Sequence, residues 1–114
     1  MNSTLNETIR AALPSLVEAL ENAPVVEGRQ LILHVETIII GQTLVTVLGE
    51  LETADYDSTL SEVVRQDVED VSLAIPLAEV EDWYDAIQLT AEREISPLVR
   101  VGATPQFRVL REDD

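Results

Sequence analysis

The chain contains no cysteine and no lysine, and only four glycines and four aromatic residues among its 114 positions. Without cysteine it has no disulfide framework, thiolate nucleophile or thiolate metal ligand. Without lysine it lacks both a Schiff-base amine and the phosphate-binding lysine of a P-loop. No apolar run approaches the roughly 18 residues of a membrane-spanning helix, and the N-terminal MNSTLNE has neither part of a signal peptide. We therefore expect a globular protein of the cytoplasm or of a virion.

Acidic residues dominate what is present. The chain has 22 of them against seven arginines, for a net charge of −15. That field repels nucleic acid phosphates and anionic membrane surfaces, which argues against both as partners. Arginine in place of lysine, and 14 valines with few aromatics, suit a protein that folds in concentrated salt, because salt strengthens apolar burial and arginine still forms ion pairs. We interpret the chain as halophilic; an acidic protein from a GC-rich mesophile is the alternative.

Residues 1–114 are long enough for a single domain. Its first half predicts a helix over Leu5–Leu20, with a kink or break at Pro14, followed by a long β-hairpin over Leu31–Leu51. Gly41-Gln42 predicts a two-residue turn, which sets Ile38 opposite Val45. Since both hairpin faces are apolar near this turn, we expect the chain's own helices to cover one face and a neighbouring subunit the other.

The second half begins with a capping box of Thr59 and Glu62, which predicts a helix that runs to Val68. A short strand then precedes an amphipathic helix over Val80–Ile95, and two short strands over Leu98–Val101 and Gln106–Leu110 close the chain as a second hairpin. The sequence therefore predicts an α+β domain, with an N-terminal helix, a long β-hairpin and further helices packed on a mostly antiparallel sheet.

Catalytic and metal-binding patterns are missing. His34 is the only histidine, and with no second histidine or cysteine we expect it to be an ordinary strand residue. Asp55 and Asp57 suggest a calcium loop, but Leu60 and Gln66 stand where its glycine and glutamate belong. No nucleophile elbow occurs, and the glycines are dispersed. We expect no catalytic, cofactor-binding or metal-binding residue, and hence no enzyme and no cofactor.

The arginines are unevenly distributed. Arg93, Arg100, Arg108 and Arg111 accompany the single acid Glu94 in residues 93–111, which therefore carry +3, whereas residues 1–92 carry −15. These arginines either pair with carboxylates of their own chain or dock on the acidic face of another copy. A repeated head-to-tail contact of the second kind closes a ring.

The candidate interface residues are those arginines and the apolar residues near the first hairpin's turn. They are Arg93, Arg100, Arg108, Arg111, Ile38, Ile40 and Val45.

The order of elements in Leu5–Leu20, Leu31–Leu51, Val80–Ile95 and Gln106–Leu110 resembles that of tail-terminator and tail-completion proteins, the head–tail connectors of tailed viruses. The resemblance implies a homo-oligomeric ring at the end of a tail tube, without catalysis. We therefore expect a structural subunit of a haloarchaeal tailed virus, whose partners are copies of itself and other assembly proteins. The alternative is an acidic regulatory protein that mimics nucleic acid and occupies a basic partner protein.

Overall fold

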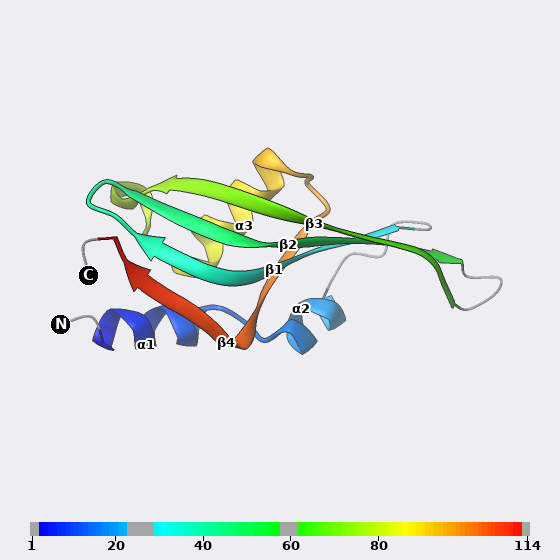
Figure 1. Cartoon of the computed structure of the whole chain (residues 1–114), viewed down its shortest axis with the longest axis horizontal. Coiled ribbons are helices and arrows are strands. Elements are labelled where there is room, and N and C mark those ends of the chain that lie inside the picture. The colour runs from blue at the N-terminus through cyan, green and yellow to red at the C-terminus, as the bar shows by residue number, and fades with distance from the viewer. Residues whose placement is uncertain (1–2, 23–28, 58–61, 113–114) are drawn as a thin grey trace.

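A computed structural model describes residues 3–22, 29–57 and 62–112 (Figure 1). The elements are, in chain order, α1 (Ser3–Ala12), α2 (Leu16–Asn22), β1 (Arg29–Ile40), β2 (Leu44–Asp57), β3 (Glu62–Pro76), the 3-10 helix η1 (Leu77–Glu79), α3 (Trp83–Glu94) and β4 (Arg100–Arg111). The strands form one sheet in the order β3-β2-β1-β4, antiparallel except for the parallel pair β1–β4. The α+β class with a mostly antiparallel sheet is thus confirmed.

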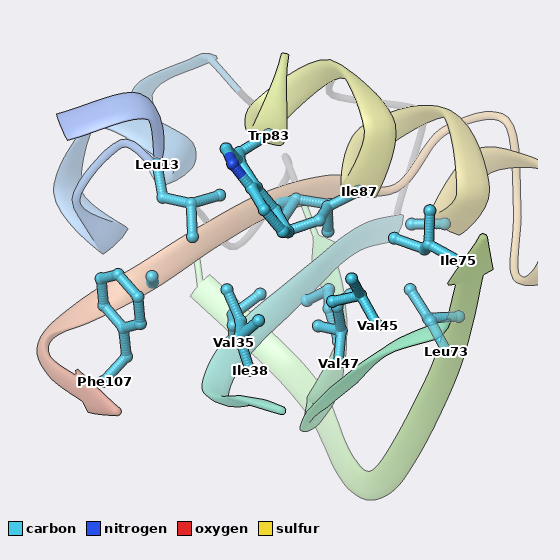
Figure 2. Packing of buried hydrophobic residues seen from close by; sticks show 14 of the residues in the cluster. Leu13, Val35, Ile38, Val45, Val47, Leu73, Ile75, Trp83, Ile87 and Phe107 are labelled. Carbon is cyan, nitrogen blue, oxygen red and sulfur yellow. The ribbon is translucent and has the colours of Figure 1, made fainter. Parts of the chain in front are cut away.

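One face of the sheet, here called the inner face, packs under α1 and α3. Figure 2 shows Leu13, which directly follows α1, and Trp83 and Ile87 of α3 above side chains of all four strands. Ile9 and Ile87 are fully buried between the layers. Burial of a large aliphatic side chain contributes about 1.5–3 kcal/mol, so each of these isoleucines stabilises the packing of the helices on the sheet.

The hairpin of β1 and β2 is confirmed, but its turn is wider than predicted. Its turn comprises residues 41–43, and the Gly41 N–H donates to the Leu44 carbonyl at 2.8 Å. Ile38 therefore lies opposite Val47 instead of Val45. A β-bulge at Glu36 shifts the register once more, so Val35 joins Ile38 on the inner face. Hairpin register follows turn geometry, and Gly-Gln specifies a two-residue turn only weakly.

The predicted helix over residues 59–68 is wrong. Thr59 and Leu60 lie outside the described residues, and from Glu62 the chain forms β3, a single strand that pairs with β2 from Asp57 to Leu44. Helical spacing of the valines competed with their preference for strands, and pairing along the whole of β2 decided between them. The ends of β1, β2 and β3 extend beyond the helices as an arm (Figure 1), and the molecule measures 52 × 24 × 21 Å.

The predicted C-terminal hairpin is also wrong, because residues 100–111 form the single strand β4 along β1. Val35 pairs with Ala103 and Thr37 with Arg108. Between these two pairs β4 contains several more residues than β1, so β4 bulges. The side chain of Arg10 holds this bulge from α1: its Nη1 donates to the Pro105 carbonyl at 3.4 Å. A bulge accommodates Pro105, which has no N–H for a ladder.

The break at Pro14 is confirmed and directs α2 to the other side of β4. The Pro14 carbonyl accepts a hydrogen bond from Ala103 N at 3.1 Å, where the chain passes the sheet edge. Ser15 and Glu18 then cap α2 reciprocally, each side chain 3.3 Å from the other's backbone nitrogen. A Cβ on Gly102 would lie 2.5 Å from the Ala19 Cβ. Glycine is thus what lets α2 approach the strand.

Candidate functional site

The second face of the sheet, the outer face, is only partly covered. Residues alternate between the two faces of a strand. Val101 and Ala103 are buried on the inner face, so Gly102 between them belongs to the outer face, and α2 packs against it there. α2 contacts β4 and β1 at this end. Towards the β1–β2 turn, none of the described helices lies over the outer face.

We call this uncovered part the acid-free face, because its residues include no aspartate or glutamate. They are Thr37, Ile39, Leu44, Thr46, Leu48, Ser72, Ala74, Arg108 and Leu110.

The strand pairing arranges this face in rows across all four strands. One row holds Leu110, Ile39, Thr46 and Ala74, and the next holds Arg108, Thr37, Leu48 and Ser72. Leu44, Leu48 and Leu110 are 49%, 36% and 44% exposed, which makes them three of the seven large apolar side chains exposed in the described chain. From strand spacing the face covers about 400 Å² of sheet surface, on which apolar side chains lie among Thr37, Thr46, Ser72 and Arg108.

Acidic residues border the acid-free face at both ends. At the turn, the Glu112 N–H donates to the Ile40 carbonyl at 3.0 Å and the Glu112 carboxylate lies beside Gly41. At the other end, the row beyond Leu48 and Ser72 places Glu50 opposite Asp70, and the bulged Glu36 is exposed beside it. The acid-free face is therefore a leucine surface with one cation, Arg108, bordered by carboxylates. Such a surface favours a partner with apolar and anionic groups over a second strongly cationic one.

The structure separates the four arginines selected from the sequence. Arg108 lies exposed on the acid-free face. Arg111 lies opposite the core residue Ile40 in the strand pairing and therefore belongs to the inner face of β4. Arg93 lies on α3 with its Nε 3.8 Å from Glu94 Oε1, both side chains exposed. Arg100 lies near the covered end. Only Arg108 thus remains on an open apolar surface.

The three apolar interface candidates are corrected. Ile38, Ile40 and Val45 are 0%, 4% and 0% exposed and belong to the chain's own core. The helices cover the face that carries them, so the side chains left for a partner are their sequence neighbours on the opposite face, Ile39 and Leu44. Both faces of the hairpin are apolar near the turn, so the sequence did not indicate which face the helices would cover.

Arg100 lies in a hollow shared with Ala12, Pro14, Glu18, Ala19 and Tyr84. Its Nε is buried and has no hydrogen-bond partner among the described residues. Arg100 as a whole is only partly exposed. This hollow joins α1, α2, α3 and β4 at one corner, and no sequence signal marked it.

Gln88 is the structural polar residue that the sequence analysis missed. Its side chain is 7% exposed; Nε2 donates to the Val99 carbonyl at 2.8 Å, and Oε1 accepts from Val101 N at 3.1 Å. Nε2 also lies 2.8 Å from Glu92 Oε2. α3 thereby fixes the start of β4 through both backbone groups that flank Arg100. A single glutamine in a helical stripe gives no advance sign of this role.

His34 lies half-buried on the outer face with its Nε2 3.4 Å from Glu52 Oε1. No group of three or more histidine, aspartate or glutamate side chains that could hold a metal ion occurs among residues 3–22, 29–57 and 62–112. On the arm, Arg29 Nε lies 3.0 Å from Asp55 Oδ1, and this hydrogen bond and its charge raise the pKa of the arginine. Asp55 is therefore tied to a neighbouring strand.

No protein-family model, curated protein or solved structure matches this chain. In the parts of the chain that the structure describes, no helix has the length and apolarity needed to span a membrane. The functional argument therefore rests on the surface of this molecule.

Proposed function

We propose that this chain is a non-enzymatic structural subunit that assembles with copies of itself into a ring, as a head–tail connector or tail terminator of a haloarchaeal tailed virus. The acid-free face carries the proposal: three exposed leucines and Arg108 occupy an uncovered sheet surface. The order helix, hairpin, helix, closing strand is the one that resembles that family. Other assembly proteins contact the finished ring.

The oligomeric state in concentrated salt tests this proposal. In molar KCl the wild-type chain is expected to have the mass of a closed ring, because screening reduces repulsion between subunits that each carry −15. Changing Arg108→Gln, the candidate arginine that lies exposed on the acid-free face, should give a folded monomer. Arg29→Gln, an exposed ion-paired arginine on the arm, is the matched control and should leave the ring intact. A monomeric wild type at high concentration would overturn the proposal.

The dependence of thermal stability on salt tests the proposed adaptation to concentrated salt separately. Dilution from molar KCl lengthens the Debye length from about 3 Å to tens of ångströms, so carboxylates that were screened repel one another. The melting temperature followed by circular dichroism should then fall steeply, with unfolding in dilute buffer. An unchanged melting temperature would show that the acidic composition does not reflect adaptation to salt.

The acidic mimic remains the second candidate, and the arm favours it. Asp70 lies opposite Glu50 on one face of β3 and β2, with Glu52 two residues further along β2, whereas Asp67 and Glu69 are exposed on the other face of β3. A mimic would bind an arginine- or lysine-rich protein as a monomer, and that binding would weaken as salt rises. Ring assembly should instead strengthen with salt, so one salt titration distinguishes the two.

A further inference from the structure

The acid-free face needs an occupant if subunits assemble head to tail. In a head-to-tail contact the occupant must be a different surface of the next copy, and the contact closes a ring when the rotation between neighbouring copies closes. The acid-free face lies on the outer side of the sheet, and the helical layer on the other side of the sheet is the candidate for its counterpart. That layer consists of α1 and α3.

α3 presents one large apolar side chain away from the core. Leu89 is 64% exposed, whereas Ile87 and Ala91 are buried against the sheet. Two residues along a helix correspond to about 200°, so Leu89 points to the solvent side of the helical layer. Among the residues that the structure describes, the other exposed large apolar side chains outside the acid-free face are Val17 on α2, Val68 on the arm and Leu98 after α3.

Charged side chains flank Leu89. The exposed Asp85 lies one turn before it and the exposed Arg93 one turn after it, and Asp82 caps the helix by accepting a hydrogen bond from Asp85 N at 3.0 Å. Residues 81–94 nevertheless contain five acids and one arginine. The net charge is opposite to that of β4, whose arginines are accompanied by no acid between residues 100 and 111. Asp85 is therefore the exposed carboxylate beside Leu89 that Arg108 can meet.

We propose that α3 of a second copy docks on the acid-free face, with Leu89 among Leu48, Leu110 and Ile39 and with Asp85 paired with Arg108. In this contact, neighbouring subunits of the ring meet through the acid-free face of one and α3 of the next, and the inference rests on the proposed function. A 12-residue helix is about 18 Å long, and four strands span roughly the same distance, so one helix fits across the face. The face supplies about half of the roughly 800 Å² that each partner buries in a standard interface, and the surrounding charged side chains supply the rest.

Complementation between two defective variants tests the pairing. Leu110→Glu damages the acid-free face and Leu89→Glu damages the helix, and each variant alone should be a folded monomer in molar KCl. Mixed in equal amounts, they should form a heterodimer through their one intact pair of surfaces, seen as a doubled mass by native mass spectrometry. Val17→Glu, which changes a 63% exposed valine on α2, is the matched control and should still form rings.

Cysteine cross-linking gives an independent readout, because the natural chain has no cysteine. Leu110→Cys and Leu89→Cys chains should form a mixed disulfide on oxidation, and neither should cross-link with itself. Self-cross-linking of Leu110→Cys would show that two acid-free faces pack on each other, which overturns the proposal. Rings that persist in both glutamate variants would also overturn it while leaving ring assembly standing. A monomeric wild type would overturn both this contact and the proposed ring assembly.

Discussion

The two faces of the sheet are built from similar side chains and have different fates. The inner face carries Val35, Ile38 and Val47, which are buried beneath α1 and α3. The outer face carries Ile39, Leu48 and, on β4, Leu110, and in the described chain only α2 covers part of it. The difference teaches that burial in this protein depends on which face the helices occupy more than on which strand residues are apolar. Mutations on either side of one strand can test that statement.

The largest expected contrast is between two adjacent isoleucines. Ile38→Ala empties a fully buried site and should lower the free energy of unfolding by about 2–5 kcal/mol. Ile39→Ala, one residue on and half-buried on the outer face, should cost about 1 kcal/mol. Urea unfolding in molar KCl measures both without changing the ionic strength. Equal losses would contradict the assignment of faces.

The next contrast concerns the polar link between α3 and β4 on the inner side. Gln88→Leu keeps the approximate size but leaves the Val99 carbonyl and the Val101 N–H without their partner. The expected loss in the free energy of unfolding is about 2–4 kcal/mol, because each buried unsatisfied group costs 1–3 kcal/mol.

Glu92→Gln is the control for this link. It retains an acceptor for Gln88 Nε2 and should change stability by less than about 0.5 kcal/mol. A similar loss in both variants would show that the charge of Glu92, and not the bonds to β4, holds the two elements together.

A smaller effect is expected where α2 covers the outer face. Gly102→Ala places a methyl group against Ala19 and should cost about 1–3 kcal/mol through overpacking. Ala19→Gly makes room for that methyl, so in the double variant the two losses should sum to more than the observed loss by about 0.5–3 kcal/mol. Strictly additive losses would show that α2 does not pack closely on this strand.

The smallest effect is expected at His34. Its ring Nε2 lies 3.4 Å from Glu52 Oε1, and glutamine can still donate a hydrogen bond there. His34→Gln should therefore change the free energy of unfolding by less than about 0.5 kcal/mol and leave assembly and metal content as they were. Stoichiometric zinc in the wild-type protein that disappears in the variant would instead assign His34 as a ligand.

Sequence alone determined the fold class, the break at Pro14, the long hairpin and the helix that contains Trp83 and Ile87. These follow from local signals: helical periodicity, β-branched runs and the backbone restriction of proline. It also isolated the arginines of residues 93–111, because charge is counted without any knowledge of contacts. It did not determine the hairpin register or the identity of β3, where helical and strand preferences of the same valines conflict.

Only the tertiary structure decided which apolar residues are core and which are surface. Ile38 and Ile39 are the same side chain in the same strand, and a bulge at Glu36 together with the placement of α1 and α3 assigns them to opposite environments. The parallel pairing of β4 with β1 likewise sets Arg108 beside Thr37 and Leu48. Such contacts join residues about 60 to 70 positions apart, and their free energy depends on burial that no local pattern encodes.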